Sequence, residues 1–168
     1  MHERVRGKSP HWSRCLQPRE SAASECACWD IKLPVAEARI HQGGGRRFLL
    51  VTRYDRQTDA HGNTTRLHQE DFCQALGVAP EMKYQNEGGP DLKACFDLLR
   101  HVTRPSAPQV LRLLDCVAFN VLLGNHDAHA KNFSLLYAPP SYQSSPALAP
   151  LYDVLSTAVY PDLPRRWR

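Results

Sequence analysis

Residues 122–137 read LLGNHDAHAKNFSLLY, and this stretch decides the fold. Two histidines, an aspartate, a lysine and two asparagines lie between two apolar runs. The preceding segment, PQVLRLLDCVAFNVLLG, predicts a helix that is apolar on nearly all sides from Val117 to Leu123 and that ends at Gly124. The segment FSLLY predicts a short strand. The sequence therefore places a polar loop between a buried helix and a strand.

The apolar segment LAPLYDVLS carries a lone acid, Asp153. A buried carboxylate is costly unless it is paired or binds a cation. Asp127, Asn132 and Asp153 together offer the oxygen ligands that Mg²⁺ prefers, so they predict a hard-cation site. Asn132 follows Asp127 by five positions, which is the spacing of the protein-kinase catalytic loop, where the Asp receives the proton of the substrate hydroxyl and the Asn holds Mg²⁺. Asp153 fits the downstream metal-binding acid, although no glycine follows it.

Residues 33–56 predict a β-hairpin, in which the segments PVAEARI and RRFLLVTRYDR are joined by a turn at residues 43–45. After the loop TDAHGNTT, the segment HQEDFCQALG predicts a short helix with acidic residues in its first turn and Gly77 past its end. The segment DLKACFDLLRHV predicts an amphipathic helix. Its apolar face is expected to consist of Leu92, Cys95, Leu99 and Val102.

The 168 residues are 42% hydrophobic and 23% charged, which predicts one domain or part of one. The net charge of +4 comes from basic residues near both ends, too diffuse to indicate nucleic-acid binding. The six cysteines lack Cys-x-x-Cys spacing and are expected to be reduced, mostly buried thiols. No apolar run approaches the ~18 residues of a membrane span, so we expect a cytoplasmic protein without a membrane partner. Residues 1–24 lack periodicity and are expected to be an unstructured or divergent leader.

Five segments in this order resemble the HipA-type serine/threonine kinases, the toxin halves of bacterial toxin–antitoxin pairs. They are FLLVTRYDR, RLHQEDFCQALG, KYQNEGGP, FNVLLGNHDAHAKNFSLLY and LAPLYDVLSTAVYP. The resemblance implies an α+β, protein-kinase-like fold, present in part. Residues 25–66 would be a remnant of the N-lobe with the hinge hairpin, and residues 67–168 a truncated C-terminal kinase lobe.

The resemblance also implies a role for each matching residue, with ATP and Mg²⁺ as cofactors. Asp127 would be the catalytic base, and His129 and Lys131 would touch phosphate or substrate. Asn132 and Asp153 would bind the metal. The hinge residues would contact the nucleotide together with a downstream glutamine; these are Thr52, Arg53, Tyr54 and Gln69. Asp55 and Arg56 are expected to form a structural pair at the junction of the lobes.

The same resemblance implies partners. They are a HipB-like helix-turn-helix antitoxin, a protein substrate with a serine or threonine hydroxyl, and DNA only indirectly through the antitoxin. Two family features are missing from the sequence before the hinge, a Gly-rich phosphate loop and a strand lysine. We therefore expect a central fragment with little or no kinase activity alone. The helix that contains LLDCVAFNVLL is expected to expose apolar surface, which would leave the chain marginally stable or dependent on a partner.

Other interpretations stay open at this point. The adjacent His126 and Asp127 resemble the metal pair of HD-type phosphohydrolases, and His126 with His129 could bind zinc. The polar cluster could instead be structural, capping the helix end and satisfying backbone groups. The sequence EGGP at residues 87–90 is most simply a turn before a helix. A non-catalytic antitoxin-binding module derived from a kinase is the alternative function.

Overall fold

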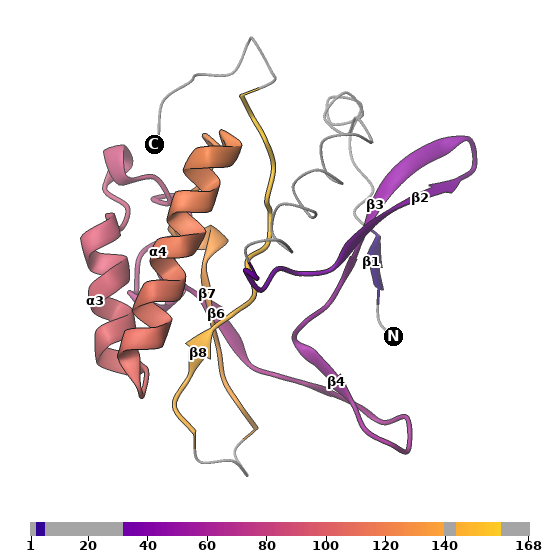
Figure 1. The fold of residues 1–168 in the computed structure, drawn as a ribbon, viewed down its shortest axis with the longest axis horizontal. Coiled ribbons are helices and arrows are strands. Elements are labelled where there is room, and N and C mark those ends of the chain that lie inside the picture. The colour runs from indigo at the N-terminus through magenta and orange to yellow at the C-terminus, as the bar shows by residue number, and fades with distance from the viewer. Residues whose placement is uncertain (1–2, 6–31, 140–143, 159–168) are drawn as a thin grey trace.

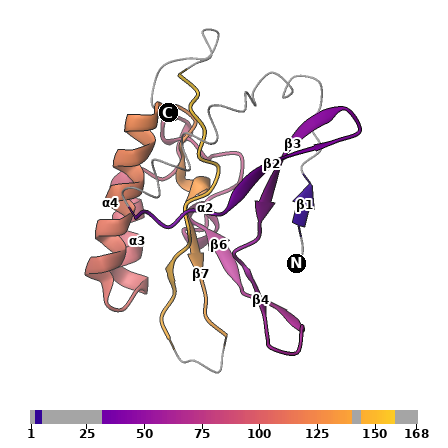
Figure 2. The same cartoon turned by 45° about the vertical axis from the view of Figure 1, so that its right-hand side comes forward.

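The computed structural model describes residues 3–5, 32–139 and 144–158. Helices and small antiparallel sheets make an α+β fold, as the sequence predicts (Figure 1). Both views place the helices α3 and α4 on one side of the molecule and the β2–β3 hairpin on the other (Figures 1 and 2). Apart from residues 3–5, the predicted leader lies outside the described residues.

The predicted β-hairpin is present. Strands β2 (Ala38–Gly43) and β3 (Arg46–Thr52) pair antiparallel from Gly43–Arg46 to Ala38–Val51 and are joined by a two-residue turn. Strand β1 (Glu3–Val5) pairs antiparallel with the other edge of β3, so the sheet order is β1-β3-β2. This sheet corresponds to the hinge hairpin that the sequence predicts.

Two expectations for the segment after the hairpin need correction. The loop TDAHGNTT is flanked by a second small hairpin, β4 (Arg56–Thr58) with β5 (Thr64–Arg66), and its turn is held by backbone N–H groups that donate to Asp59. The predicted helix at residues 68–77 is only a single turn, α2 (Phe72–Ala75). Residues before it form strand β6 (Gln69–Asp71), because they pair with β7. Asp71 is the N-cap of α2 and accepts from the Gln74 N–H.

A three-stranded antiparallel sheet, ordered β6-β7-β8, carries the centre of the fold. The predicted strand FSLLY is β7 (Ser134–Leu136), and β8 is Ala147–Leu148. The chain preceding the first hairpin returns to this region, since Ala36 N–H donates to the Leu151 carbonyl at 2.8 Å and Leu151 N–H donates to Pro34 at 2.9 Å. The N-terminal hairpin is thereby anchored next to the segment that carries Asp153.

The helices α3 (Leu92–Val102) and α4 (Ser106–Leu123) cover the sheet and close the core. Four side chains from different elements are fully buried there: Phe72, Leu99, Leu113 and Leu135. The predicted apolar face of α3 is partly wrong, because Leu92 is 45% exposed and Leu98 is buried in its place. Two short 3₁₀ turns complete the described fold, η2 (Gln85–Glu87) and η3 (Ala130–Asn132).

The prediction of a buried helix is also partly wrong for the second half of α4. Val121 and Leu122 are 52% and 85% exposed, and the outer face continues through Leu111 and Leu114. The prediction of exposed apolar surface on this helix is confirmed. By length and composition alone, α4 is long and apolar enough to cross a membrane, a test that core helices of soluble proteins also pass.

Three of the six cysteines lie in the described region. Cys73, Cys95 and Cys116 are buried free thiols, as predicted. Burial raises the pKa of Cys95 to about 12, so this thiol is a neutral core side chain. Cys15, Cys26 and Cys28 lie outside the described residues.

Candidate functional site

The polar loop begins where α4 ends. Gly124 adopts φ 70° at the C-cap, a left-handed conformation that glycine adopts without a steric penalty. Asn120, buried in the last turn of α4, accepts from Asn125 Nδ2 at 2.8 Å. Asn125 Nδ2 also lies 3.4 Å from the Asp153 carbonyl oxygen. A buried asparagine pair therefore ties the loop to the segment that carries Asp153.

The chain after Asp153 docks on the same turn. Thr157 and Ala158 donate their N–H groups to the Gly124 carbonyl, each at 3.1 Å. The Thr157 hydroxyl accepts from the His126 N–H at 2.7 Å. A Cβ at Gly124 would lie 2.7 Å from the Ala158 Cβ, so close packing requires glycine here as well. The loop is thus fixed at its entry by backbone contacts.

The two predicted metal-binding residues meet at the end of the loop. Asn132 Nδ2 donates to Asp153 Oδ2 at 3.1 Å, and Asn132 Oδ1 accepts from the His129 N–H at 2.9 Å. Asn132 is buried, whereas Asp153 is exposed, so the expectation that Asp153 is a buried carboxylate is wrong. Asp153 has φ 58°, a left-handed conformation that Asp adopts more readily than most residues and that tends to mark functional sites.

The donor set fits a hard cation. Each Asn132 and Asp153 oxygen has lone pairs beyond the contacts just described, and amide and carboxylate oxygens are the ligands that Mg²⁺ prefers. Among the described residues no group of three His, Cys, Asp or Glu side chains could hold a metal ion. The zinc and HD-type interpretations, which need such a group, therefore gain no support.

Asp127 lies at the exposed front of the loop. Its Oδ1 accepts a hydrogen bond from the Tyr84 hydroxyl at 2.8 Å, from a segment 43 residues earlier. The ring of His129 stands edge-on to the Tyr84 ring, with 5.2 Å between centroids. Asp127 and His129 thus share a neighbour that the sequence analysis gave no role.

His129 lies among charges of both signs. Burial lowers the pKa of its imidazole, and the Lys83 ammonium lowers it further. The carboxylates of Asp127 and Asp153 act in the opposite direction but do not reverse the shift. A neutral imidazole, able to donate or accept a hydrogen bond, is therefore favoured here.

Lys131 enters the site through its backbone. Its carbonyl oxygen accepts from the Tyr152 hydroxyl at 2.6 Å, and that hydroxyl lies 2.7 Å from Ser134 Oγ. The ring of Tyr152 stacks on that of Tyr54, with 6.1 Å between centroids. Tyr54 from the predicted hinge is therefore connected to the polar loop through one aromatic side chain. Burial raises the pKa of Tyr54 to about 12.

The other predicted hinge residues are engaged within the chain. Thr52 donates its N–H to the Glu37 carbonyl at 2.8 Å. Arg53 binds Asp55 through two bonds, Nε to Oδ1 at 2.8 Å and Nη2 to Oδ2 at 2.5 Å. The Arg53 side chain therefore points to Asp55. The hinge groups that could contact a nucleotide are then backbone groups of residues 52–54 and the Tyr54 ring.

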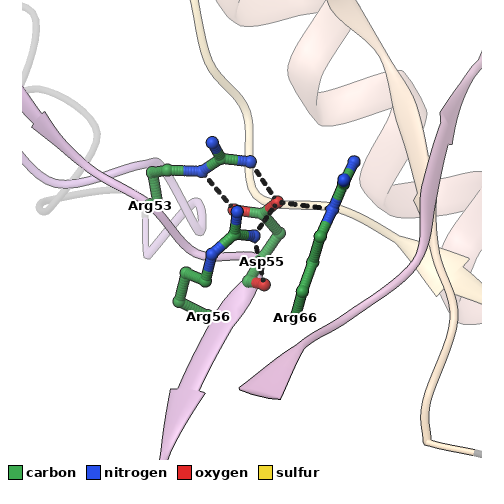
Figure 3. A network of polar contacts seen from close by, with 4 residues as sticks. All are labelled: Arg53, Asp55, Arg56 and Arg66. Atoms are coloured by element: carbon green, nitrogen blue, oxygen red, sulfur yellow. Dashed lines mark hydrogen bonds and ion pairs between the residues drawn. The ribbon is translucent and has the colours of Figure 1, made fainter. Parts of the chain in front are cut away.

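Asp55 is the centre of an arginine cluster (Figure 3). Its side chain is 4% exposed, and Arg56 Nη1 lies 2.6 Å from Oδ2, the pair that the sequence predicts. Arg66 approaches from β5, with its Nε at 3.9 Å. Burial acts to raise the pKa of the Asp55 carboxyl, but the hydrogen bonds and charges of Arg53 and Arg56 outweigh it and lower that pKa. The cluster fixes the segment that connects the β2–β3 hairpin to the β4–β5 hairpin.

Gln69 lies on β6, opposite Leu136 of β7. Its Oε1 is buried and has no hydrogen-bond partner among the described residues. A buried acceptor without a partner costs free energy, which is a reason to expect a donor there when a ligand is bound.

Sequence reasoning missed three contributors to the site: Tyr84, Tyr152 and the Asn120–Asn125 pair. Asn120 carried a usable signal, because it is a lone amide in an otherwise apolar stretch of helix. The two tyrosines carried none, since their contacts depend on segments that are distant in the sequence.

The chain is similar to several known proteins. A family model described as the HipA-like C-terminal domain matches residues 8–166. Y4mE of Sinorhizobium fredii, a candidate kinase by name, is 56% identical over 133 residues, which cover 79% of this chain and 31% of Y4mE. The serine/threonine-protein kinase toxin HipA of Shewanella oneidensis is 31% identical over 79% of this chain and 32% of that protein.

A solved structure matches as well. It is the complex of HipA, HipB and operator DNA from Shewanella oneidensis MR-1, with a TM-score of 0.70 and 28% identity over 84% of this chain. The match covers 35% of that chain. The chain therefore spans about a third of the length of the relatives that it matches.

Proposed function

The chain belongs to the HipA-like C-terminal domain family, and from this membership we propose that it carries the catalytic loop and metal-binding residues of a serine/threonine kinase. The observation that carries the proposal is the 3.1 Å contact of Asp153 with Asn132, the residue that follows Asp127 at the kinase spacing. The reaction would transfer the γ-phosphoryl group of ATP to a serine or threonine hydroxyl of a protein.

In this proposal Asp127 accepts the proton of the attacking hydroxyl. The hydroxyl oxygen bonds to the γ-phosphorus of ATP. The bond from that phosphorus to the β–γ bridging oxygen breaks, and ADP is released. Asn132 and Asp153 would hold Mg²⁺. The ion would neutralise phosphate charge when bound. His129 and Lys131, in the same loop, would contact phosphate or substrate.

The nucleotide would lie between the hinge and the loop. Backbone groups of Thr52 and Arg53 and the ring of Tyr54 are proposed to contact the adenine, because Tyr54 stacks on Tyr152, which in turn binds the loop. The unpartnered Gln69 Oε1 would accept a hydrogen bond from the nucleotide.

We propose that the chain by itself transfers phosphate slowly or not at all. Phosphoryl transfer depends mainly on positioning and charge stabilisation, including a lysine on the phosphates. The one lysine that the structure describes ahead of the hinge, Lys32, lies in a turn rather than a strand. The chain also spans only about a third of its kinase relatives.

A non-catalytic function is the second candidate. The matched structure is a complex of HipA with HipB and operator DNA. By resemblance, a HipB-like helix-turn-helix antitoxin would be the partner here, DNA would be contacted only through it, and the complex would be cytoplasmic.

Calorimetry separates the two functions. ATP titrated into the wild-type chain with Mg²⁺ should release a heat that is absent without Mg²⁺. Asp153→Ala should abolish that heat. Asp115→Ala, which removes an exposed acid from α4, should retain it. A flat titration for both the wild type and Asp115→Ala would reject the kinase function and leave the antitoxin-binding one.

A further inference from the structure

The segment of residues 82–89 carries the tyrosine that meets Asp127. It turns through η2, and the Tyr84 carbonyl accepts from the N–H groups of Glu87 at 3.0 Å and Gly89 at 2.9 Å. The backbone of Tyr84 is thereby held at the start of a tight turn. This turn contains the first three residues of the EGGP sequence, to which neither proposed function assigns a role.

Gly89 is required by close packing inside this turn. A Cβ at this position would lie 2.5 Å from the Met82 carbonyl oxygen and 2.7 Å from that of Tyr84. Both are backbone atoms, so the turn could not hold its shape with a larger residue. Because Gly89 has no side chain, the turn can fold back against the backbone of Tyr84.

The Tyr84 side chain is fixed from several sides. The His129 ring stands edge-on to it at 5.2 Å, and Lys83 Nζ lies 4.6 Å from its centroid. The hydroxyl donates to Asp127 Oδ1 at 2.8 Å. Burial, followed by the hydrogen bond to Asp127, raises the pKa of Tyr84, so the phenol keeps its proton as a donor.

We propose that Tyr84 is a positioning residue for Asp127, and that the turn of residues 84–89 exists to hold it there. The inference rests on the proposed function, in which Asp127 is the base. A phenol that donates to Oδ1 restricts rotation of the carboxylate and leaves Oδ2 for the hydroxyl of the protein substrate. A base held in one orientation spends more time in the productive geometry.

A second tyrosine–carboxylate pair offers a matched control. Tyr137, which directly follows β7, donates its hydroxyl to Glu70 Oε2 on β6 at 3.0 Å. Burial, followed by the hydrogen bond to Glu70, raises the pKa of Tyr137. The pair resembles Tyr84–Asp127 in chemistry but neither member belongs to the proposed site.

The contact is tested by a crossover NMR titration of the full chain with ring-labelled tyrosine. Asp127→Asn should lower the pKa of Tyr84 and leave the titration of Tyr137 unchanged. Glu70→Gln should lower the pKa of Tyr137 and leave the titration of Tyr84 unchanged. A Tyr84 titration that is indifferent to Asp127→Asn would overturn the inference, whatever the chain does with nucleotides.

The positioning role is tested by Tyr84→Phe against Tyr137→Phe. Calorimetry should give Tyr84→Phe the same affinity for ATP and Mg²⁺ as wild type within twofold, because the hydroxyl touches Asp127 and not the proposed metal ligands. At saturating ATP its phosphoryl-transfer rate should fall about tenfold relative to Tyr137→Phe. Equal rates for the two variants, including no detectable transfer by either, would overturn the positioning role.

Gly89→Ala should reproduce the loss seen in Tyr84→Phe, because it displaces the turn. If Gly89→Ala fails to fold, Tyr84→Phe still decides the matter. A chain that shows the Tyr84–Asp127 coupling but binds no ATP with Mg²⁺ would overturn the proposed kinase function and leave the contact standing. A chain that binds ATP without the coupling would overturn the inference alone.

Discussion

Asn132 donates its side-chain amide to the Asp153 carboxylate at 3.1 Å, across 21 residues of sequence. Asp153 lies in a left-handed backbone conformation, and its carbonyl is within 3.4 Å of the Asn125 amide. The proposed metal-binding pair is therefore positioned by backbone docking as well as by the contact between its two side chains.

Asn125→Ala tests this docking. It leaves Asn120 Oδ1 and the Asp153 carbonyl without a donor, so we expect a loss of about 1 to 3 kcal/mol in the free energy of unfolding, measured by urea denaturation. The affinity for ATP with Mg²⁺ should fall as well. Asn63→Ala, at an exposed turn, is the matched control. It should have little effect on the free energy of unfolding or on the affinity for ATP. Equal effects of the two variants would contradict the docking account.

Asp55→Asn should destabilise the fold through the arginine cluster. The substitution replaces the buried carboxylate with a neutral amide, so the guanidinium groups of Arg53 and Arg56 lose their countercharge and one acceptor, and we expect a loss of about 2 to 3 kcal/mol in the free energy of unfolding. Both arginines retain some exposure, which keeps the effect below that of a fully buried pair. Urea denaturation at pH 7 measures the loss.

The same carboxylate predicts a pH dependence. Because its folded pKa lies below the unfolded value of about 3.9, the stability that it contributes is present above that value and is lost as the pH falls through the folded pKa. Wild type should therefore lose stability below about pH 4 more steeply than Asp55→Asn. Parallel pH profiles for the two proteins would show that the ion pairs contribute nothing.

His129 predicts a second pH dependence with its own window. Its folded pKa is lowered by burial and by Lys83, whereas an unfolded histidine titrates near 6.5. Between these two values the unfolded chain binds more protons, so stability should rise with pH up to about 6.5. His129→Asn should flatten that slope in urea denaturation across pH 5 to 7. An NMR titration midpoint of His129 above 6.5 would contradict the assignment.

The two faces of α4 should respond differently to truncation. Leu113→Ala removes a fully buried side chain and should cost about 2 to 5 kcal/mol of unfolding free energy. Leu111→Ala, at a side chain 61% exposed, should cost less than about 0.5 kcal/mol and should reduce binding of a dye specific for exposed apolar surface. Similar costs at both positions would mean that the outer face is covered in solution.

The sequence predicted the elements whose patterns are local. Alternation and a glycine turn predicted the first hairpin, and Gly124 predicted the end of α4. Helical spacing predicted α3, but it could not distinguish Leu92 from Leu98, because both lie near the edge of the apolar face. The burial of α4 was misjudged for a related reason, since an all-round apolar pattern gives no direction to the core.

Within the site, the spacing of Asp127 and Asn132 and the lone acid at Asp153 were readable from sequence. The meeting of Asn132 with Asp153 agrees with that hypothesis, while the catalytic roles stay predictions. Tyr84 was not readable, because its bond to Asp127 arises from tertiary packing. The strand β6 was missed because its pairing with β7 overrides the helical appearance of residues 68–77.

The central claim, that Asn132 and Asp153 hold a divalent cation beside a nucleotide, is tested most directly by NMR with Mn²⁺ in place of Mg²⁺ and ATP present. Paramagnetic broadening should be strongest at the Asn132 side-chain amide and the Asp153 backbone amide, and should disappear in Asp153→Ala. Broadening centred on an exposed acid such as Asp97 or Asp115, or unchanged by Asp153→Ala, would contradict the account.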